Sequence, residues 1–534
     1  MLSYLAGNDQ SGTSNLVTSV VLLTTVVVSS SLLSSSINEK KQKQQQRRSW
    51  APTPPIVPSY VPFLGPAGEL LKLGFGEFAK KYSREFNNSP IVSAKVAGVN
   101  IHFIVEPAAF PAIFRNNPTD LSMGPAIAEI GHTLFGMSKK GLSIFNDDVR
   151  KRNMDALHNH VLKSNGLGNI IENAQQEIHE QLSVLLGDST GRSTTTLDLH
   201  DMVRKTIFYA TLRVAISKSE CVVNDEFIRF FDIFEEAIPK AFYGLPIKYV
   251  AHDSYKAREE LVKIFQSDEF VPSAYLQERR CFLSSLGMSA DDIARDDLYW
   301  TSVVCTNLIP SHFWHIYYIA CNPNAFHGIR QEVDNVIAAR KQKKEDRHQQ
   351  QHLPFDGTFT MEELDSMVGL ESAYKESNRL SSTILIGREV MRDMEIDLRL
   401  KKKPSKYFLS KGSRIALYPP LLHQDPSVFE NPKDYVWDRF LVDSTTGKSP
   451  TFTNSQGEVI HDPFRTFGGG AHHCPGRKLA SNIAKCFAAN LVYSYDMEVI
   501  GGGEYPIEFD MSRDGFGVLR PKTNVTMRFT PRKK

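Results

Sequence analysis

Hydrophobic and polar residues recur with two different periods along most of this chain. Residues 91–105, rich in valine and isoleucine, alternate in the manner of half-buried β-strands. Apolar residues recur at helical spacing in four longer stretches, which are 67–82, 170–186, 225–240 and 255–266. Helix therefore predominates, and the pattern predicts a mainly α fold with a smaller β region, of the α+β class. No internal repeat or break in composition divides residues 67–534, so we expect a single domain there.

A long run from Asp296 to Ala320 is almost uncharged but too polar and aromatic for a membrane span. It contains Pro310, which has no backbone N–H and disturbs the preceding turn of a helix. We therefore expect a long buried helix with a local distortion at Pro310. Farther along, the charged, glutamine-rich tract 338–352 is typical of a solvated insertion between helices.

The beginning of the chain has the pattern of a membrane anchor. No charge lies between Asp9 and Glu39, and basic residues cluster just after this stretch, which places the following chain in the cytosol. The expected segments are a short lumenal N-terminus (1–15), a transmembrane helix (16–37) and a basic, proline-rich linker (38–66). The alternative is a cleaved secretory signal, but its positive charges would precede the apolar run.

Charge and cysteine content exclude several classes of protein. The net charge is +2, so we expect no nucleic-acid partner. The six cysteines are scattered and form no CxxC pair, which argues against a disulfide framework and a zinc ribbon. This use of cysteine is best explained by a protein whose folded part faces a reducing compartment.

One of these cysteines follows a glycine-rich loop in the stretch PFRTFGGGAHHCPGRKLA, residues 463–480. Three glycines allow close backbone approaches before Cys474, and an apolar helical pattern begins just after it. Backbone N–H groups at a helix start lower the pKa of a thiol and can donate to its sulfur, which suits a thiolate metal ligand. The alternative is a buried cysteine after a glycine turn.

The spacing of this loop resembles the FxxGxxxCxG signature of the cytochrome P-450 superfamily. The matching residues are Phe467, Gly470, Cys474 and Gly476. The resemblance implies the P-450 fold, a haem b cofactor and Cys474 as the axial thiolate on its iron, which favours O–O cleavage. Many members carry arginine two residues before the cysteine, bonded to a haem propionate. His472 stands there, which implies a weaker or pH-dependent contact.

A second element of the resemblance lies upstream. Glu376 and Arg379 form an ExxR pair on one helix face, and Arg439 in the sequence WDRF should complete it in support of the haem site. Such a pair on its own is usually a surface salt bridge. Arg388 resembles a propionate-binding arginine, with a strand-edge arginine as the alternative. The early WxxxR motif is missing, and its candidates are Arg150, Lys151, Arg152 and His158.

The central helix departs from the common pattern of the superfamily. Residues 305–311, CTNLIPS, lack the acid–alcohol pair that delivers protons to oxygen on the iron. Asn307 can hydrogen-bond oxygen or water there but does not readily donate a proton, and it can equally be a satisfied helix residue. The pattern NxxPxxFW resembles the branch of bile-acid sterol hydroxylases and prostacyclin synthase.

The resemblance implies a membrane-anchored monooxygenase that takes electrons from NADPH-cytochrome reductase. We expect a single-pass protein of the endoplasmic reticulum that oxidises a hydrophobic sterol, terpenoid or related secondary metabolite. The serine- and glutamine-rich segments give the chain a fungal character. The alternative within the branch is an isomerase or dehydratase that rearranges a peroxide without a reductase. A haem carrier or sensor without turnover is a third interpretation.

Overall fold

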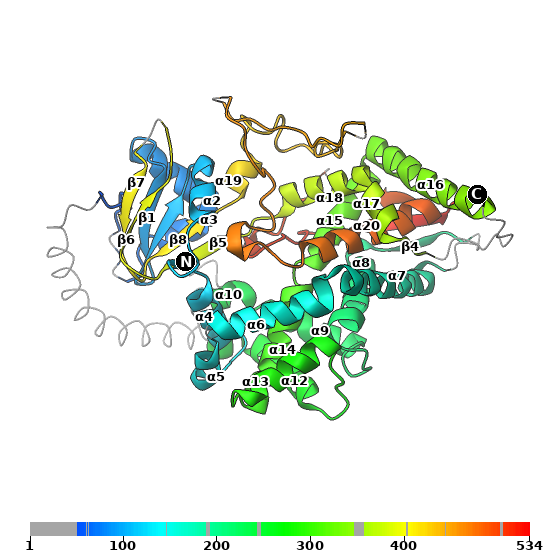
Figure 1. Ribbon diagram of the computed structural model, residues 1–534, viewed down its shortest axis with the longest axis horizontal. Coiled ribbons are helices and arrows are strands. Elements are labelled where there is room, and N and C mark those ends of the chain that lie inside the picture. The colour runs from blue at the N-terminus through cyan, green and yellow to red at the C-terminus, as the bar shows by residue number, and fades with distance from the viewer. Residues whose placement is uncertain are drawn as a thin grey trace. The chain divides into compact units, whose positions relative to one another are not determined.

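A computed structural model of the 534-residue chain describes residues 51–533 with several gaps (Figure 1). The gaps are residues 60, 62, 146, 188–192, 243–246, 347–356, 402–403, 444, 456 and 502–505. The expected anchor, 16–37, and the N-terminus before it lie outside the described residues. Within the described part, no helix is both long and apolar enough to cross a bilayer.

The chain divides into two compact units. Unit 1 contains residues up to Ala126 together with Leu385–Leu421, and unit 2 contains Ile127–Ile384 and Leu422–Lys534. The single catalytic domain expected over 67–534 stays a prediction.

Unit 1 contains the larger sheet, a mixed one of five strands in the order β1-β2-β8-β5-β3. Its members are β1 (Ile91–Val96), β2 (Val99–Ile104), β3 (Leu121–Ser122), β5 (Ile386–Val390) and β8 (Arg414–Leu417). A separate hairpin joins β6 (Met394–Asp397) to β7 (Lys406–Leu409), and the helices here are α2 (Ala67–Glu85) and α3 (Phe110–Phe114). The strands expected over 91–105 are therefore confirmed, as an antiparallel pair whose register joins Ile91 to Ile104. Phe78 of α2 packs on Phe103 of β2 with ring centroids 5.6 Å apart.

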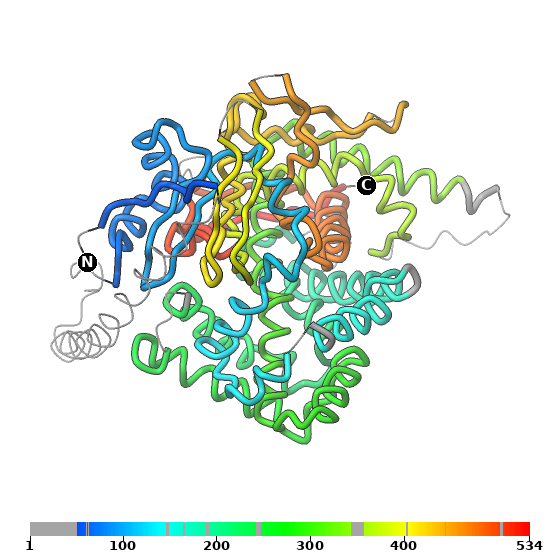
Figure 2. Tube along the Cα trace, turned by 60° about the vertical axis from the view of Figure 1, so that its left-hand side comes forward, coloured from blue at the N-terminus to red at the C-terminus, as the bar shows by residue number. Residues whose placement is uncertain are grey.

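Unit 2 is mostly helical (Figure 2). It also contains the largest cluster of buried apolar side chains. Its helices are α5 (Lys139–Ile144), α6 (Asp147–Leu157), α7 (Ser164–Leu186), α8 (Leu199–Thr211), α9 (Asp225–Glu235), α10 (Ile238–Phe242), α11 (Ile247–Val250), α12 (His252–Gln266), α13 (Ala274–Ser285), α14 (Ala290–Cys305), α15 (Leu308–Cys321), α16 (Pro323–Asp346), α17 (Met361–Ser366), α18 (Val368–Ser381) and α20 (Arg477–Ser494). Its sheet has the order β4-β10-β9, formed by Thr195–Asp198, Thr526–Pro531 and Tyr495–Ile500. Helices α4 (Gly124–Thr133) and α19 (Pro420–His423) span the boundaries between the units.

The predicted helices at 170–186 and 255–266 lie inside α7 and α12, whereas the stretch 225–240 is divided between α9 and α10. The first part of the tract 338–352 differs from its prediction as an insertion between helices, because α16 continues as far as Asp346, and residues 347–352 lie outside the described part of the chain. A high content of charged residues is compatible with a helix in solvent, so composition alone did not exclude one here.

The central apolar run also differs from its prediction. It forms two helices, α14 and α15, that are separated at Thr306 and Asn307 rather than distorted at Pro310 itself. The ring of a proline clashes with the carbonyl four residues earlier, which is that of Thr306, so the break lies one turn before the proline. Helix α15 is buried along almost its whole length and packs on α8, α16, α18 and α20.

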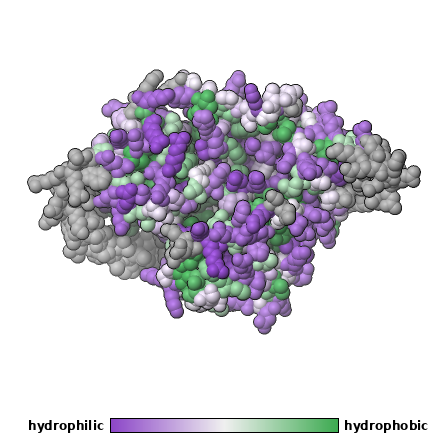
Figure 3. Space-filling model, in the orientation of Figure 1, coloured by the Kyte–Doolittle hydropathy of each residue, from purple (hydrophilic) through white to green (hydrophobic). Residues whose placement is uncertain are grey.

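The surface is polar over most of the face in Figure 3, where hydrophobic side chains appear in small scattered groups. Scattered apolar residues of this kind are ordinary for a folded domain, and the figure alone indicates no interface.

Candidate active site

The loop before α20 is shaped by its glycines. Gly468 and Gly470 have φ values of +78° and +67°, in the left-handed region that side chains disfavour. This turn returns the chain so that the Cys474 N–H donates to the Phe467 carbonyl at 3.0 Å. Cys474 then lies three residues before the first residue of α20, half-buried, as the sequence predicts.

Burial and backbone dipoles act on the Cys474 thiol in opposite directions. Burial raises its pKa above the ordinary value, whereas the backbone N–H groups of Gly476 and Arg477 and the Arg477 charge lower it. The lowering expected from the helix start is present, but burial outweighs it in the protein without a ligand. A metal ion reverses that balance, because a coordinating thiol is deprotonated outright.

The other residues of the signature surround the loop. Phe467 is half-buried and packs edge-on against Phe464, with ring centroids 5.9 Å apart. His472 ends the short 3-10 turn Gly470–His472 and is exposed. Gly476 precedes α20, and a side chain there would add an atom 3.9 Å from the Cys474 sulfur.

Glu376 and Arg379 of α18 form a fully buried ion pair. Two hydrogen bonds join them, from Arg379 Nε to Glu376 Oε2 at 2.8 Å and from Nη2 to Oε1 at 2.9 Å. Arg439 donates through Nε to Glu376 Oε1 at 3.0 Å, and the Val436 N–H donates to the same oxygen at 3.1 Å. The structure therefore brings the three predicted residues into one cluster.

A chain of hydrogen bonds connects this cluster to the cysteine loop. Arg379 donates to the His423 carbonyl at 2.6 Å, and the ring Nε2 of His423 accepts from the Arg465 N–H at 3.0 Å. The Arg465 carbonyl in turn accepts from the Gly468 N–H at 3.0 Å. His423 is completely buried, and burial lowers its pKa to about 3, so its ring is neutral. Sequence reasoning missed His423, since no local pattern separates it from an ordinary core histidine.

Asn307 lies at the break between α14 and α15. Its side-chain oxygen Oδ1 accepts from the Val518 backbone N–H at 3.0 Å. The neighbouring Thr306 hydroxyl is buried and has no hydrogen-bond partner within the described part of the chain. No carboxylate belongs to the break, which agrees with the unusual sequence CTNLIPS.

Arg388 belongs to β5 in unit 1. Its side chain is buried, and its one hydrogen bond among the described residues joins Nη1 to the adjacent Gly387 carbonyl at 2.7 Å. Burial lowers the pKa of Arg388 to about 10. A buried cation that lacks an anionic partner in the described residues fits an anionic group of a cofactor.

The early-helix candidates differ in their surroundings. Arg152 is exposed and lies over the Phe282 ring, 4.2 Å from its centroid, and Lys151 and His158 are also exposed. Arg150 is partly buried. The structure does not single out a second propionate-binding residue among them.

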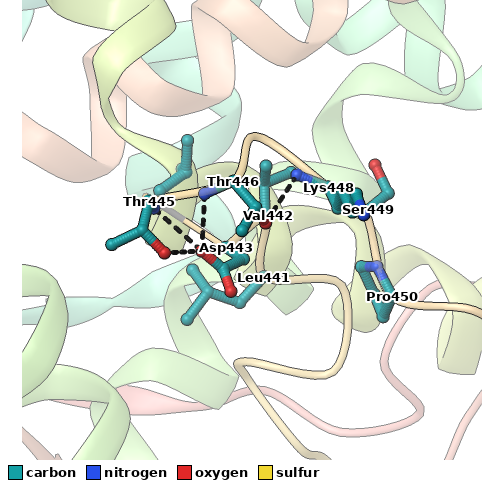
Figure 4. A pocket seen from close by; sticks show the side chains of 9 residues that line it. Leu441, Val442, Asp443, Thr445, Thr446, Lys448, Ser449 and Pro450 are labelled. Carbon is teal, nitrogen blue, oxygen red and sulfur yellow. Dashed lines mark hydrogen bonds between the residues drawn. The ribbon is translucent and has the colours of Figure 1, made fainter.

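A shallow pocket lies elsewhere, along residues 441–450 (Figure 4). The Asp443 carboxylate accepts hydrogen bonds from Thr445 and Thr446, and these bonds lower its pKa to about 2. This is a hydrogen-bonded surface turn, and no candidate site residue lines it.

These observations define a half-buried thiol on a glycine loop that an ion-pair cluster supports. The sequence profile of the family named Cytochrome P450 matches residues 307–528, which include both features. A cyanobacterial enzyme solved with retinoic acid bound has the same fold, with a TM-score of 0.64 at 18% identity over 90% of this chain and 100% of that one. The chain resembles the cytochrome P450 superfamily in sequence over residues 307–528 and in fold over 90% of its length. It is an oxidoreductase of the P450 monooxygenase class, whose cofactor is a haem with an axial cysteine thiolate.

Two relatives indicate which branch of the superfamily the chain resembles. The chain is 29% identical to 25-hydroxycholesterol 7-alpha-hydroxylase of Rattus norvegicus over 430 residues, which cover 77% of this chain and 96% of the relative. It is also 29% identical to prostacyclin synthase of Homo sapiens over 261 residues, 48% of this chain and 49% of the relative. The predicted resemblance to the sterol hydroxylase and prostacyclin synthase branch is thereby confirmed.

Proposed function

We propose that the protein hydroxylates or otherwise oxidises a hydrophobic polycyclic substrate, with Cys474 as the axial ligand of the haem iron. The observation that carries this proposal is the continuous chain of hydrogen bonds from the Glu376–Arg379–Arg439 cluster through His423 to the cysteine loop. A ligand loop held in this way keeps its sulfur in place with little reorganisation, which a thiolate ligand requires.

The residues of the chain fit a haem in three respects. Cys474 offers a half-buried thiol at a helix start, and glycines at 468–470 allow close approach of a flat ring. His472 at the end of the 3-10 turn is the candidate for one propionate, and Arg388, which belongs to unit 1, stays a candidate through the family resemblance alone. When bound, the haem supplies the oxygen chemistry, which the thiolate promotes by donating electron density.

We assign the substrate to the sterol, terpenoid or related secondary-metabolite class. Support comes from the similarity over most of the chain to a hydroxylase named for 25-hydroxycholesterol. Asn307 is the polar group proposed to meet the reacting end of the substrate, because it lies at the break between α14 and α15 and its side chain makes no cap hydrogen bond to α15. The N-terminal half of such enzymes varies most in sequence, so we assign no individual substrate contacts.

The cysteine assignment is tested with carbon monoxide and dithionite. The purified protein should show the red-shifted Soret band of a thiolate-bound haem, and Cys474→Ala should lose that band. Cys321→Ala is the matched control, since Cys321 is also partly buried but is not in the loop. If Cys474→Ala keeps the band, the proposed ligand is wrong.

We further propose that residues 16–37 anchor the protein in the endoplasmic reticulum membrane with the catalytic part in the cytosol. NADPH-cytochrome reductase would then supply electrons from the same side. The apolar stretch and the basic residues after it support this topology. The full chain should stay with membranes in alkaline carbonate, and protease added to sealed microsomes should digest its catalytic part.

A second function, isomerisation or dehydration of a peroxide, has one specific observation in its favour. The break between α14 and α15 carries an amide and no carboxylate, and prostacyclin synthase is similar to 48% of the chain. Such a reaction needs no external electrons. Product formation from a lipid hydroperoxide without reductase would favour this function, whereas strict dependence on NADPH and reductase would favour hydroxylation.

A further inference from the structure

The segment 513–519 forms a turn that is fixed by other parts of unit 2. The Thr383 N–H donates to the Gly517 carbonyl at 2.7 Å, and the Leu519 N–H donates to the Ser381 carbonyl at 2.9 Å. On the other side, the indole N–H of Trp314 in α15 donates to the Leu519 carbonyl at 2.6 Å. Val518 and Leu519 are buried. The turn is therefore held both by the chain that follows α18 and by α15.

This fixed turn determines which way the Asn307 carboxamide faces. The Val518 N–H can only donate, so the atom 3.0 Å from it must be the carbonyl oxygen of Asn307. The two polar atoms of a carboxamide lie on opposite sides of its carbon. Once Oδ1 is bound to Val518, the NH₂ group is directed away from the turn, and no protein acceptor for it is found in the described residues. The exposed end of Asn307 is thus a hydrogen-bond donor.

Gly517 makes this contact possible. Its φ of +121° lies in a region that side chains rarely adopt, and an added Cβ would stand 2.0 Å from Asn307 Oδ1. Even alanine at this position would displace the carboxamide or the turn. The turn itself cannot move easily, because Gly517 and Leu519, the two neighbours of Val518 in the chain, are hydrogen-bonded to other parts of unit 2.

We propose that Gly517 and Val518 are positioning residues that set the polarity of Asn307, so that its N–H groups face the ligand in the haem site. The site would accordingly select ligands that present a hydrogen-bond acceptor oxygen at that point, such as an ether, peroxide or carbonyl oxygen. This inference rests on the proposed function, which places Asn307 beside the haem. Pro310 contributes by ending α14 where Asn307 is released from the helix.

Carbon monoxide bound to the reduced holoenzyme is the probe. A donor N–H near the bound molecule lowers its C–O stretching frequency, which infrared spectroscopy measures directly and independently of turnover. The wild type should have the lowest frequency. Asn307→Leu, which has no donor, and Gly517→Ala, which displaces the donor, should both shift it upward. Gly287→Ala is the control for backbone strain, since its φ is +82° and its added Cβ would meet nothing within 4 Å.

The possible outcomes separate this inference from the proposed function. An unchanged C–O frequency in Asn307→Leu, or a lower one, would overturn the donor assignment even if Gly517→Ala failed to fold. A shift in Asn307→Leu without one in a folded Gly517→Ala would overturn the role of the turn. In both cases the thiolate band and its loss in Cys474→Ala would leave the proposed haem ligand intact, whereas their failure would refute that ligand independently.

Discussion

Glu376 is the residue on which the support of the cysteine loop depends most directly. One of its oxygens accepts from Arg379, Arg439 and the Val436 N–H, and the side chain has no exposed surface. The pair itself need not stabilise the fold strongly, because both charges lose their hydration. Removal of one partner is different, since it leaves a buried guanidinium without a counter-charge.

The substitution Glu376→Gln should therefore lower the free energy of unfolding by roughly 3–5 kcal/mol. Urea denaturation followed by fluorescence measures this change. The matched control is Glu498→Gln, which removes an exposed cross-strand partner of Arg528 and should cost less than about 1 kcal/mol. An equal decrease in the free energy of unfolding in the two variants would contradict the importance assigned to burial.

The sequence predicted this cluster because its three members belong to recognisable motifs. It did not predict His423 or the contact of Asn307 with Val518. These residues are separated from their partners by 44 and 211 positions. A local pattern carries no information about which distant backbone groups meet, so only the folded chain shows them.

At the level of secondary structure, the division between α14 and α15 has the clearest functional meaning. The apolar pattern is continuous across it, and for that reason the sequence suggested one long helix. Pro310 prevents this by clashing with the carbonyl of Thr306 and by lacking an N–H. The existence of a buried helix was predictable from the pattern, but the position of its break depends on sterics one turn earlier.

Pro310→Ala should join the two helices, because alanine supplies the missing N–H and removes the clash. Hydrogen exchange, measured by mass spectrometry, should slow in peptides that cover 306–311. It should quicken at Val518, which loses its acceptor when Asn307 turns with the helix. The control is Pro323→Ala at the first residue of α16, where proline is compatible with a helix. Unchanged exchange over 306–311 would show that another feature causes the break.

On the scale of the whole molecule, the helix-rich composition and the main strands followed from periodicity, whereas the strand order did not. β5 and β8 are far from β2 in the chain and join its sheet through pairings that no local pattern encodes. The buried titratable residues inside this fold make its stability depend on pH, and three buried histidines in unit 2 each contribute to that dependence.

Burial lowers the pKa of His312 to about 4 and the pKa values of His315 and His423 to about 3, from 6.5. Between these values each of the three histidines binds more protons in the unfolded chain than in the folded one, so its contribution to stability falls as pH decreases. Below pH 6.5 each histidine should lower the free energy of unfolding by about 1.4 kcal/mol per pH unit, until its folded pKa is reached.

Urea titrations at a series of pH values test this dependence. His315→Phe keeps an aromatic ring beside Tyr374, 5.5 Å away, but cannot take up a proton, so it should reduce the slope. A slope that stays the same in this variant would contradict the assignment of His315.

The hydrogen-bonded connection from α18 through His423 to the cysteine loop also has a consequence for how the enzyme matures. In the folded chain the start of the loop is hydrogen-bonded to the His423 ring, and the His423 carbonyl is hydrogen-bonded to Arg379 of α18, so the loop depends on residues well before it in the chain. Competence to receive haem should therefore be acquired late, after the helical core has assembled. A newly made chain would pass through a compact intermediate that cannot yet bind haem. Haem would then bind to the folded protein and would not guide its folding.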